Sequence, residues 1–237
     1  MGSSGVFERR AGPALCKQNM QLFGLHTNPQ KSAELLCDTH VISQARETIQ
    51  ILSTALWLRG YELTGEIDCS EYGCGVRQPY KLFGKHHPIV WWCASSRAHF
   101  EWTRRHGDAL MAEYTHRTGD KVHMCQLFLD HLKEHTATHG LPDGMPQNEC
   151  PNVFIQRVED ELGKKRAGEW LPRIAVKNPP EGCAWGMVAV DSSPVPNDWV
   201  ASYKDNYLHK RSVWEGKNRK MTWSAFGQLG GKKRTRE

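Results

Sequence analysis

The sequence contains no apolar stretch that approaches the length needed to cross a lipid bilayer, which excludes a membrane-spanning protein. The first residues include Arg9 and Arg10, but no long apolar segment follows them. A secretory signal is therefore not expected, and residues 1–19 are predicted to be a flexible leader. We accordingly expect a cytoplasmic protein.

Paired cysteine motifs are also missing. The eight cysteines include no Cys-x-x-Cys pair, and the closest two, Cys69 and Cys74, have no matching second pair. A chain of 237 residues can bury a core without disulfides or structural metals. Most of the cysteines are therefore predicted to be free thiols, and a structural zinc site is not favoured.

The sequence has no His-Glu-x-x-His motif, so zinc-protease chemistry has no support. His131, His135 and His139 do share one helical face, where two imidazoles could bind a metal ion. An exposed helix end that titrates near neutral pH is the favoured interpretation. The cofactor is unknown from the sequence, and a divalent metal is one candidate.

Helical periodicity is the strongest structural signal in the chain. The apolar residues of one predicted helix face are Val41, Ala45, Ile49, Leu52 and Leu56. Gly60 should end this helix, and the segment from Lys31 should also be helical, with Asn28 as the N-cap and Pro29 at the first helical position.

The remaining segments complete a mainly α fold. Residues 20–27 are predicted to be extended, and residues 61–87 to be a loop or insertion with a short hairpin. Further helices are expected over 89–114, over 121–139, and from about 196 to 207. The sequence thus predicts one compact helical domain over 20–228, with a short N-terminal extended segment, an irregular insertion and a basic tail over 229–237.

Four polar residues form a stripe beside the apolar face of the long helix. Cys37, His40, Gln44 and Glu47 follow one another at three- and four-residue spacing. Their side chains could bind a base, transfer protons or contribute ligands to a metal. The alternative is that His40 and Glu47 only pair or cap on a helix surface.

Other imidazoles and a guanidinium stand out further along the chain. His86 and His87 precede a predicted helix start, where backbone N–H groups attract anions. Arg117 and His123 follow within a short stretch, and the planar guanidinium suits bidentate phosphate binding.

Cationic residues gather toward the C-terminus. Those assigned to nucleic-acid binding are Lys210, Arg211, Lys232, Lys233 and Arg234. Such an arm neutralises phosphates and releases counterions, although a solvated solubility tail is an equal alternative. The nine tryptophans could stack an extruded base, but at helix spacing aromatic residues more often belong to the core.

Several segments together resemble a family of small helical proteins encoded by tailed phages and large DNA viruses. The motifs are Cys-Asp-x-His with a downstream Gln-x-Leu-Ser-Thr-Ala, then His-Pro with a tryptophan, Glu-x-x-x-Arg-x-Gly with a nearby histidine, and a final tyrosine-rich helix. The matching residues are Cys37, Asp38, His40, Gln50, Leu52, Ser53, Thr54, Ala55, His87, Pro88, Trp91, Trp102, Glu113, Arg117, Gly119, His123, Tyr203 and Tyr207. The sequence departs from the pattern in a longer region over 62–80 and in Ser43-Gln44, where Lys-Met is expected. The viral context that the resemblance implies favours DNA or nucleotide metabolism in the host cytoplasm.

The leading hypothesis is a phage-type enzyme that acts on nucleic acid, with DNA base modification or excision as the more specific form. His40, Glu47, His87 and His123 are the predicted catalytic residues, converging on a cleft, and Arg117 and the tail would bind phosphates. One alternative is a nucleic-acid-binding module without chemistry. The other is a metal-dependent enzyme acting on a small substrate.

Overall fold

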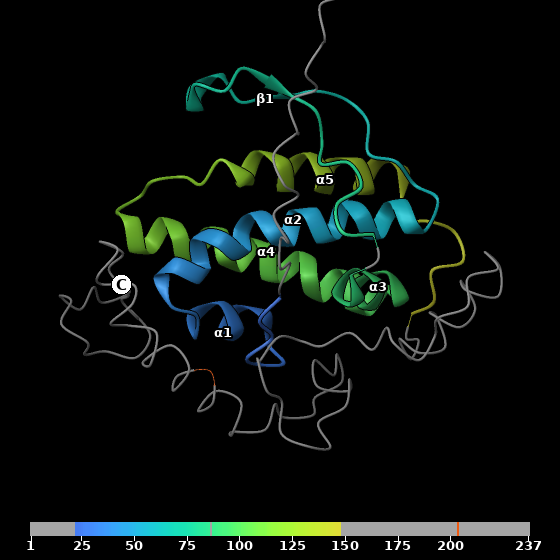
Figure 1. Cartoon of the computed structure of the whole chain (residues 1–237), viewed down its shortest axis with the longest axis horizontal. Coiled ribbons are helices and arrows are strands. Elements are labelled where there is room, and N and C mark those ends of the chain that lie inside the picture. Colours follow the sequence, from blue (N-terminus) through green and yellow to red (C-terminus); the bar gives the residue numbers. More distant parts are fainter. Residues whose placement is uncertain (1–21, 86, 148–202, 204–237) are drawn as a thin grey trace, which may run out of the picture.

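The computed structural model describes residues 22–85, 87–147 and 203 of the chain. This part of the protein contains five α-helices and one two-stranded sheet. The mainly α fold predicted from the sequence is therefore confirmed, and Figure 1 shows the helices stacked side by side with the small sheet at one edge.

Helix α1 spans Pro29–Glu34. The side chain of Asn28 accepts hydrogen bonds from the backbone N–H groups of Gln30 and Lys31, and Pro29 occupies the first helical turn. This is the start that the sequence predicts, because proline has no N–H to lose at that position. Residues 22–25, which precede it, are not helical and form no bridge with another strand of the described chain.

Helix α2 spans Asp38–Leu58 and is the central element of the fold. Val41, Ala45 and Ile49 are buried as predicted, and Gly60, with φ of 81°, follows the end of the helix. Cys37 is the N-cap and not part of the helix, which corrects its expected place on the helical stripe. The cause is its extended backbone, at φ −71° and ψ 157°.

The segment after α2 is a loop with a short hairpin, as predicted. Strands β1 (Ile67–Asp68) and β2 (Val76–Arg77) pair antiparallel, with a 3-10 turn η1 (Ser70–Tyr72) between them. Farther along, the hydroxyl of Thr54 donates to the carbonyl of Phe83 and accepts from its N–H. These bonds attach the end of the loop to α2.

The single helix expected over residues 89–114 is wrong. The structure has two helices there, α3 (Pro88–Ser95) and α4 (Arg97–Thr118), separated by Ser96 in an extended conformation. The Ser96 side chain caps α4 by accepting from the N–H of His99. A serine side chain that accepts a backbone hydrogen bond competes with the hydrogen bonds of a continuous helix. The first helix therefore ends before Ser96, and a new helix starts after it.

Helix α5 spans Cys125–His139. The predicted helix over 121–139 therefore begins four residues too early but ends correctly. Gly119, with φ of 74°, ends α4, and Asp120 also has a positive φ of 67°. Two consecutive left-handed residues turn the chain away from the helix axis, so the next helix cannot start at once.

The core lies where α2 packs against α4, with α3 and α5 also in contact with both helices and α1 against α4 (Figure 1). Trp91, Trp92 and Trp102 are buried there, which confirms the core assignment for these three indoles, whereas Trp57 is exposed. No helix of the described chain is long and apolar enough to span a membrane.

Several predictions fall outside the residues that the structure describes. These are the leader over 1–19, the helix from about 196 to 207 apart from Tyr203, and the basic tail over 229–237 with Lys210 and Arg211 before it. The domain boundaries therefore stay predictions.

Candidate functional site

The polar stripe of α2 places His40, Gln44 and Glu47 along one face of the helix. His40 and Glu47 are seven residues apart, which is nearly two full turns, so their side chains leave the helix in almost the same direction. Gln44 lies between them. The structure thus places two of the four residues predicted to be catalytic on one face of α2, nearly two turns apart, and their catalytic roles stay predictions.

Gln44 connects Glu47 to the N-terminal segment. Its Oε1 accepts from the backbone N–H of Phe23 at 3.2 Å, and its Nε2 donates to Oε2 of Glu47 at 3.1 Å. The backbone donor fixes which end of the amide is oxygen, so the nitrogen must face the carboxylate. A hydrogen bond donated to a carboxylate favours its ionised form and holds it in one orientation.

His40 packs beside two aromatic rings that also contact each other. Phe23 stacks on its imidazole with ring centroids 4.5 Å apart and an interplanar angle of 11°, and Nδ1 lies 3.0 Å from the hydroxyl of Tyr203. Both aromatic side chains are buried, with Phe23 3% and Tyr203 1% exposed. The imidazole is therefore held in one place by packing on its face and a hydrogen bond at its edge.

Cys37 adjoins the same hydroxyl. The backbone N–H of Cys37 donates to the Tyr203 oxygen at 3.1 Å, and that oxygen lies 3.6 Å from Sγ of the same residue. Burial raises the pKa of the Cys37 thiol, which the hydrogen bond from Tyr203 partly opposes. Cys37 is therefore a neutral thiol near neutral pH, not a reactive thiolate.

Arg117 is buried at the junction of three helices. Its side chain is 5% exposed, and it forms ion pairs with Asp38 at 2.9 Å and with Glu113 at 2.9 Å. It also donates to the backbone carbonyls of Ala33, Glu34 and Leu36, at the C-terminal end of α1. Burial raises the pKa of the Asp38 carboxyl, and the guanidinium opposes that rise. In the folded protein the guanidinium thus joins α1, α2 and α4, and its predicted phosphate contact stays untested.

His87 caps helix α3. Its Nδ1 accepts the backbone N–H of Ile89 at 3.3 Å, and its backbone lies at the N-cap with φ of −79° and ψ of 129°. An accepting Nδ1 places the proton of a neutral ring on Nε2. Burial lowers the pKa of His87, which favours this neutral form.

His123 lies just before helix α5. Its Nδ1 accepts the N–H of Cys125 at 3.1 Å, and its ring meets Tyr114 edge to face with centroids 4.7 Å apart. Burial, and then the nearby positive charge of Arg46, lower its pKa. Arg46 immediately precedes Glu47, about 100° away around α2, and no contact between His123 and His40, Gln44 or Glu47 is seen among the described residues.

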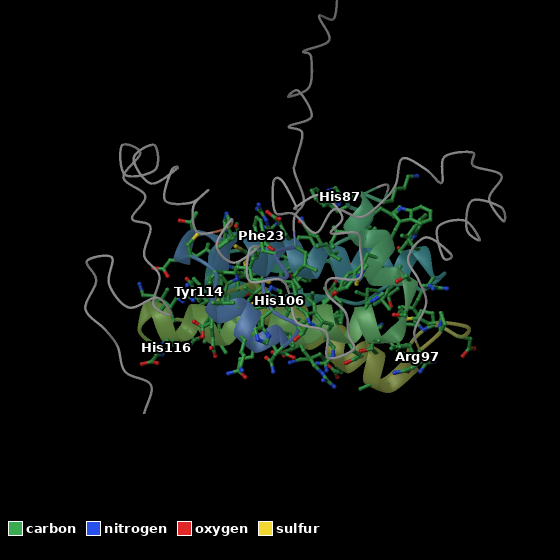
Figure 2. The ribbon with its side chains drawn as sticks, turned by 90° about the horizontal axis from the view of Figure 1, so that it is seen from below. Phe23, His87, Arg97, His106, Tyr114 and His116 are labelled. Carbon is green, nitrogen blue, oxygen red and sulfur yellow. The ribbon has the colours of Figure 1, made fainter. Side chains whose placement is uncertain are left out.

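The described contacts of His40, His87 and His123 thus involve different neighbours. In Figure 2, Phe23, which stacks on His40, Tyr114, which contacts His123, and His87 itself are labelled at separate places on the molecule. The convergence of all three imidazoles on one cleft stays a prediction.

The histidines of α5 form a row along that helix. Ring centroids of His131 and His135, and of His135 and His139, are 5.0 Å apart in each pair. Nε2 of His131 lies 2.8 Å from the carbonyl of Thr64, which ties this row to the loop after α2. Within residues 22–85, 87–147 and 203, no group of three or more His, Cys, Asp or Glu side chains is arranged to hold a metal ion.

Sequence reasoning missed three residues of the site. Phe23 stacks on His40, Tyr203 lies within hydrogen-bonding distance of its Nδ1, and the positive charge of Arg46 lowers the pKa of His123. Tyr203 was assigned only to a tyrosine-rich helix, because no local pattern connects it with a residue 163 positions earlier. The signal that could have revealed Arg46 is its position next to Glu47, at the edge of the polar stripe.

Residues 20–127 match the family model described as pyrimidine dimer DNA glycosylase. The matched region runs from before α1 to the first three residues of α5 and contains Phe23, His40, Gln44 and Glu47. Neither the curated proteins nor the solved structures include a match to the chain.

Proposed function

We propose that the protein is a DNA glycosylase that breaks the bond between C1′ of deoxyribose and the base at one pyrimidine of a dimer, with its reaction centre at His40 and Glu47. The observation that carries the proposal is that the region matched to the glycosylase family contains the whole hydrogen-bonded path from Phe23 through Gln44 to Glu47. DNA is the substrate that this family description implies, in line with the hypothesis of base excision.

Glu47 has the chemistry that a glycosylase needs. When the bond between C1′ of deoxyribose and the pyrimidine nitrogen breaks, the electron pair leaves with the base and positive charge develops on the sugar. An ionised carboxylate stabilises such a charge, as in the carboxylate pairs of glycoside hydrolases. Glu47 can also accept the proton of a water molecule whose oxygen forms the new bond to C1′.

His40 supplies a second proton-transfer group two turns before Glu47. Because Nδ1 bonds to the Tyr203 hydroxyl, the proposal assigns proton donation to the departing base to Nε2. The proton lost by water and the proton gained by the base then balance over one catalytic cycle. His87 and His123 would contribute only if DNA binding brings their segments to the lesion.

A glycosylase must take its target out of the base stack. Phe23 and Tyr203 are buried, so their rings support His40 and do not offer a surface for stacking a base. Nonspecific affinity for the duplex would come from the predicted tail cations Lys210, Arg211, Lys232, Lys233 and Arg234, which neutralise phosphates.

Substitution of Glu47 by Gln tests the proposal, since it removes the charge and keeps the shape and an oxygen that can accept from Gln44. The substrate is a DNA duplex with one thymine dimer. Base release here means cleavage of one glycosidic bond, after which the base stays joined to its dimer partner, and its single-turnover rate is measured by strand scission at the abasic sugar in hot alkali. We expect a rate loss of about 10²–10⁴ with little change in melting temperature. The matched control is Glu66→Gln, the same change on an exposed residue outside the site.

Three outcomes separate the hypotheses. Selective rate loss in Glu47→Gln supports the glycosylase. Base release by that variant at the wild-type rate removes Glu47 from the mechanism. Salt-dependent binding of the lesion duplex by the wild-type protein, with no base release at all, favours the module that binds DNA without chemistry.

A further inference from the structure

The hydroxyl of Tyr203 occupies a buried junction inside the candidate site. It lies 3.0 Å from Nδ1 of His40, 3.1 Å from the backbone nitrogen of Cys37 and 3.6 Å from the Cys37 sulfur. Its ring also meets Phe23 edge to face, with centroids 5.6 Å apart. The imidazole, its stacking partner and the start of α2 therefore all meet at this one phenol.

The hydrogen-bonding capacity of the phenol limits what it can do there. A tyrosine hydroxyl has one proton to donate and oxygen lone pairs that accept. The N–H of Cys37 can only donate, so the oxygen must accept from it. Among the described residues, the hydroxyl proton has two neighbours that can accept it, Nδ1 of His40 and Sγ of Cys37.

These two neighbours correspond to two states of His40. When Nδ1 carries no proton, the hydroxyl donates to it, and the neutral ring has its proton on Nε2. When Nδ1 carries a proton, as it must in the imidazolium, Nδ1 donates to the phenol oxygen and the hydroxyl proton turns to the sulfur. Rotation about one C–O bond therefore satisfies both states, while Phe23 holds the ring in place.

We propose that Tyr203 is a positioning residue for His40, whose hydroxyl turns between Nδ1 and the Cys37 sulfur so that the imidazole keeps its orientation as it gains and loses a proton. The inference rests on the proposed function for its role in base excision. The protonation of His40 is coupled to the Tyr203 hydroxyl and the Cys37 sulfur whether or not the protein is a glycosylase. This coupling can therefore be tested separately from the proposed function.

The first test follows the His40 imidazole by two-bond ¹H–¹⁵N correlation spectra of the full chain, in which its two ring nitrogens report tautomer and titration directly. Tyr203→Phe removes the acceptor for Nδ1–H and keeps the ring, so the titration midpoint of His40 should move to lower pH by about one unit. Tyr61→Phe is the matched control, because it removes a phenol hydroxyl beyond the opposite end of α2. An unchanged His40 spectrum in folded Tyr203→Phe overturns the proposal.

A second pair of variants keeps the test decisive if Tyr203→Phe does not fold. Cys37→Ala removes the sulfur that accepts the hydroxyl proton, but leaves the backbone N–H and Tyr203 in place. It should favour the neutral His40 tautomer with its proton on Nε2 and lower the titration midpoint, and Cys37→Ser, which restores an acceptor, should reverse both effects. Equal His40 spectra in Cys37→Ala and Cys37→Ser contradict the proposal.

The pH dependence of base release tests whether the orientation of His40 by Tyr203 matters for the reaction. In Tyr203→Phe the limb of the rate profile that depends on His40 should move by the same interval as the spectroscopic midpoint. If the His40 midpoint moves while the wild-type protein releases no base, the proposed function fails and the positioning role stands. If base release is observed but its pH profile does not shift with the His40 titration midpoint, Tyr203 orients His40 without contributing to the reaction. The catalytic part of the proposal is then wrong.

Discussion

Replacement of Arg117 by Met separates a structural role of the guanidinium from the phosphate-binding role that the sequence predicts. The change removes the charge and every donor while keeping much of the side-chain volume. It removes the Arg117 cation from beside the Glu113 carboxylate, which is only 4% exposed, and it removes the donor that carbonyl groups at the end of α1 share. Asp38, at 27% exposure, can turn more easily to water.

The expected destabilisation is large because the ion pair between Arg117 and Glu113 is buried. Removal of one partner of a buried ion pair costs about 3–5 kcal/mol of unfolding free energy, since the remaining charge is uncompensated. For a domain of this size, that corresponds to a fall in melting temperature of roughly 6–20 °C. A double variant, Arg117→Met with Glu113→Leu, should recover much of the loss, because it removes the stranded charge as well.

Arg104 provides the matched control. It also joins two carboxylates, Glu101 at 2.8 Å and Asp108 at 3.0 Å, but these acids are 36% and 38% exposed. Arg104→Met should therefore cost only about 0–1 kcal/mol. The assay is urea and thermal unfolding followed by circular dichroism, together with DNA affinity measured over a range of salt. If Arg117→Met unfolds like Arg104→Met but loses DNA affinity with a shallower salt dependence, the buried-clamp reasoning is refuted and Arg117 contacts phosphate.

Two further perturbations have calculable outcomes. Burial lowers the pKa of both His99 and His106 from 6.5 to about 4, so below pH 6.5 the unfolded chain binds protons that the folded chain does not. The unfolding free energy should therefore decrease between pH 6.5 and about 4, by about 1.4 kcal/mol per pH unit for each histidine, and His106→Gln should reduce that slope in urea titrations; equal slopes would show that His106 does not contribute. Deletion of residues 230–237 removes four cations and should weaken DNA binding without lowering the melting temperature, reducing the slope of log affinity against log salt by up to about 3.6. Unchanged affinity at low salt would mean that this segment serves only solubility.

Local patterns predicted the helices well where the pattern itself decides the structure. The apolar spacing of α2 and the Asn28-Pro29 start of α1 are properties of a few neighbouring residues, and both predictions are confirmed. The sequence does not predict the break at Ser96, because helical periodicity continues across this residue. A single serine within such a pattern is too weak a signal to identify an N-cap.

The candidate site was likewise predictable only where local geometry determines it. His40, Gln44 and Glu47 could be placed on one face because helix geometry fixes their spacing. The contact of Tyr203 with His40 depends on how distant parts of the chain pack, which no periodicity encodes.

Arg117 shows a different limit of sequence reasoning. A guanidinium near a helix end suits a phosphate and suits backbone carbonyls equally well, since both offer oxygen acceptors. Only the position of α1 shows that carbonyl groups occupy its donors in the folded chain. Its i, i+4 spacing from Glu113 was the one local sign of an internal ion pair.

The most direct measurement is base release from a duplex that carries one thymine dimer at a known position. The wild-type protein is incubated with this duplex and with the same undamaged sequence, and alkali-labile sites are mapped at single-nucleotide resolution. A glycosylase centred on Glu47 should produce one alkali-labile site, at the dimer and in the damaged duplex alone, and Glu47→Gln should abolish it. Binding of the damaged duplex without any alkali-labile site, or equal cleavage of both duplexes, would contradict the proposed function.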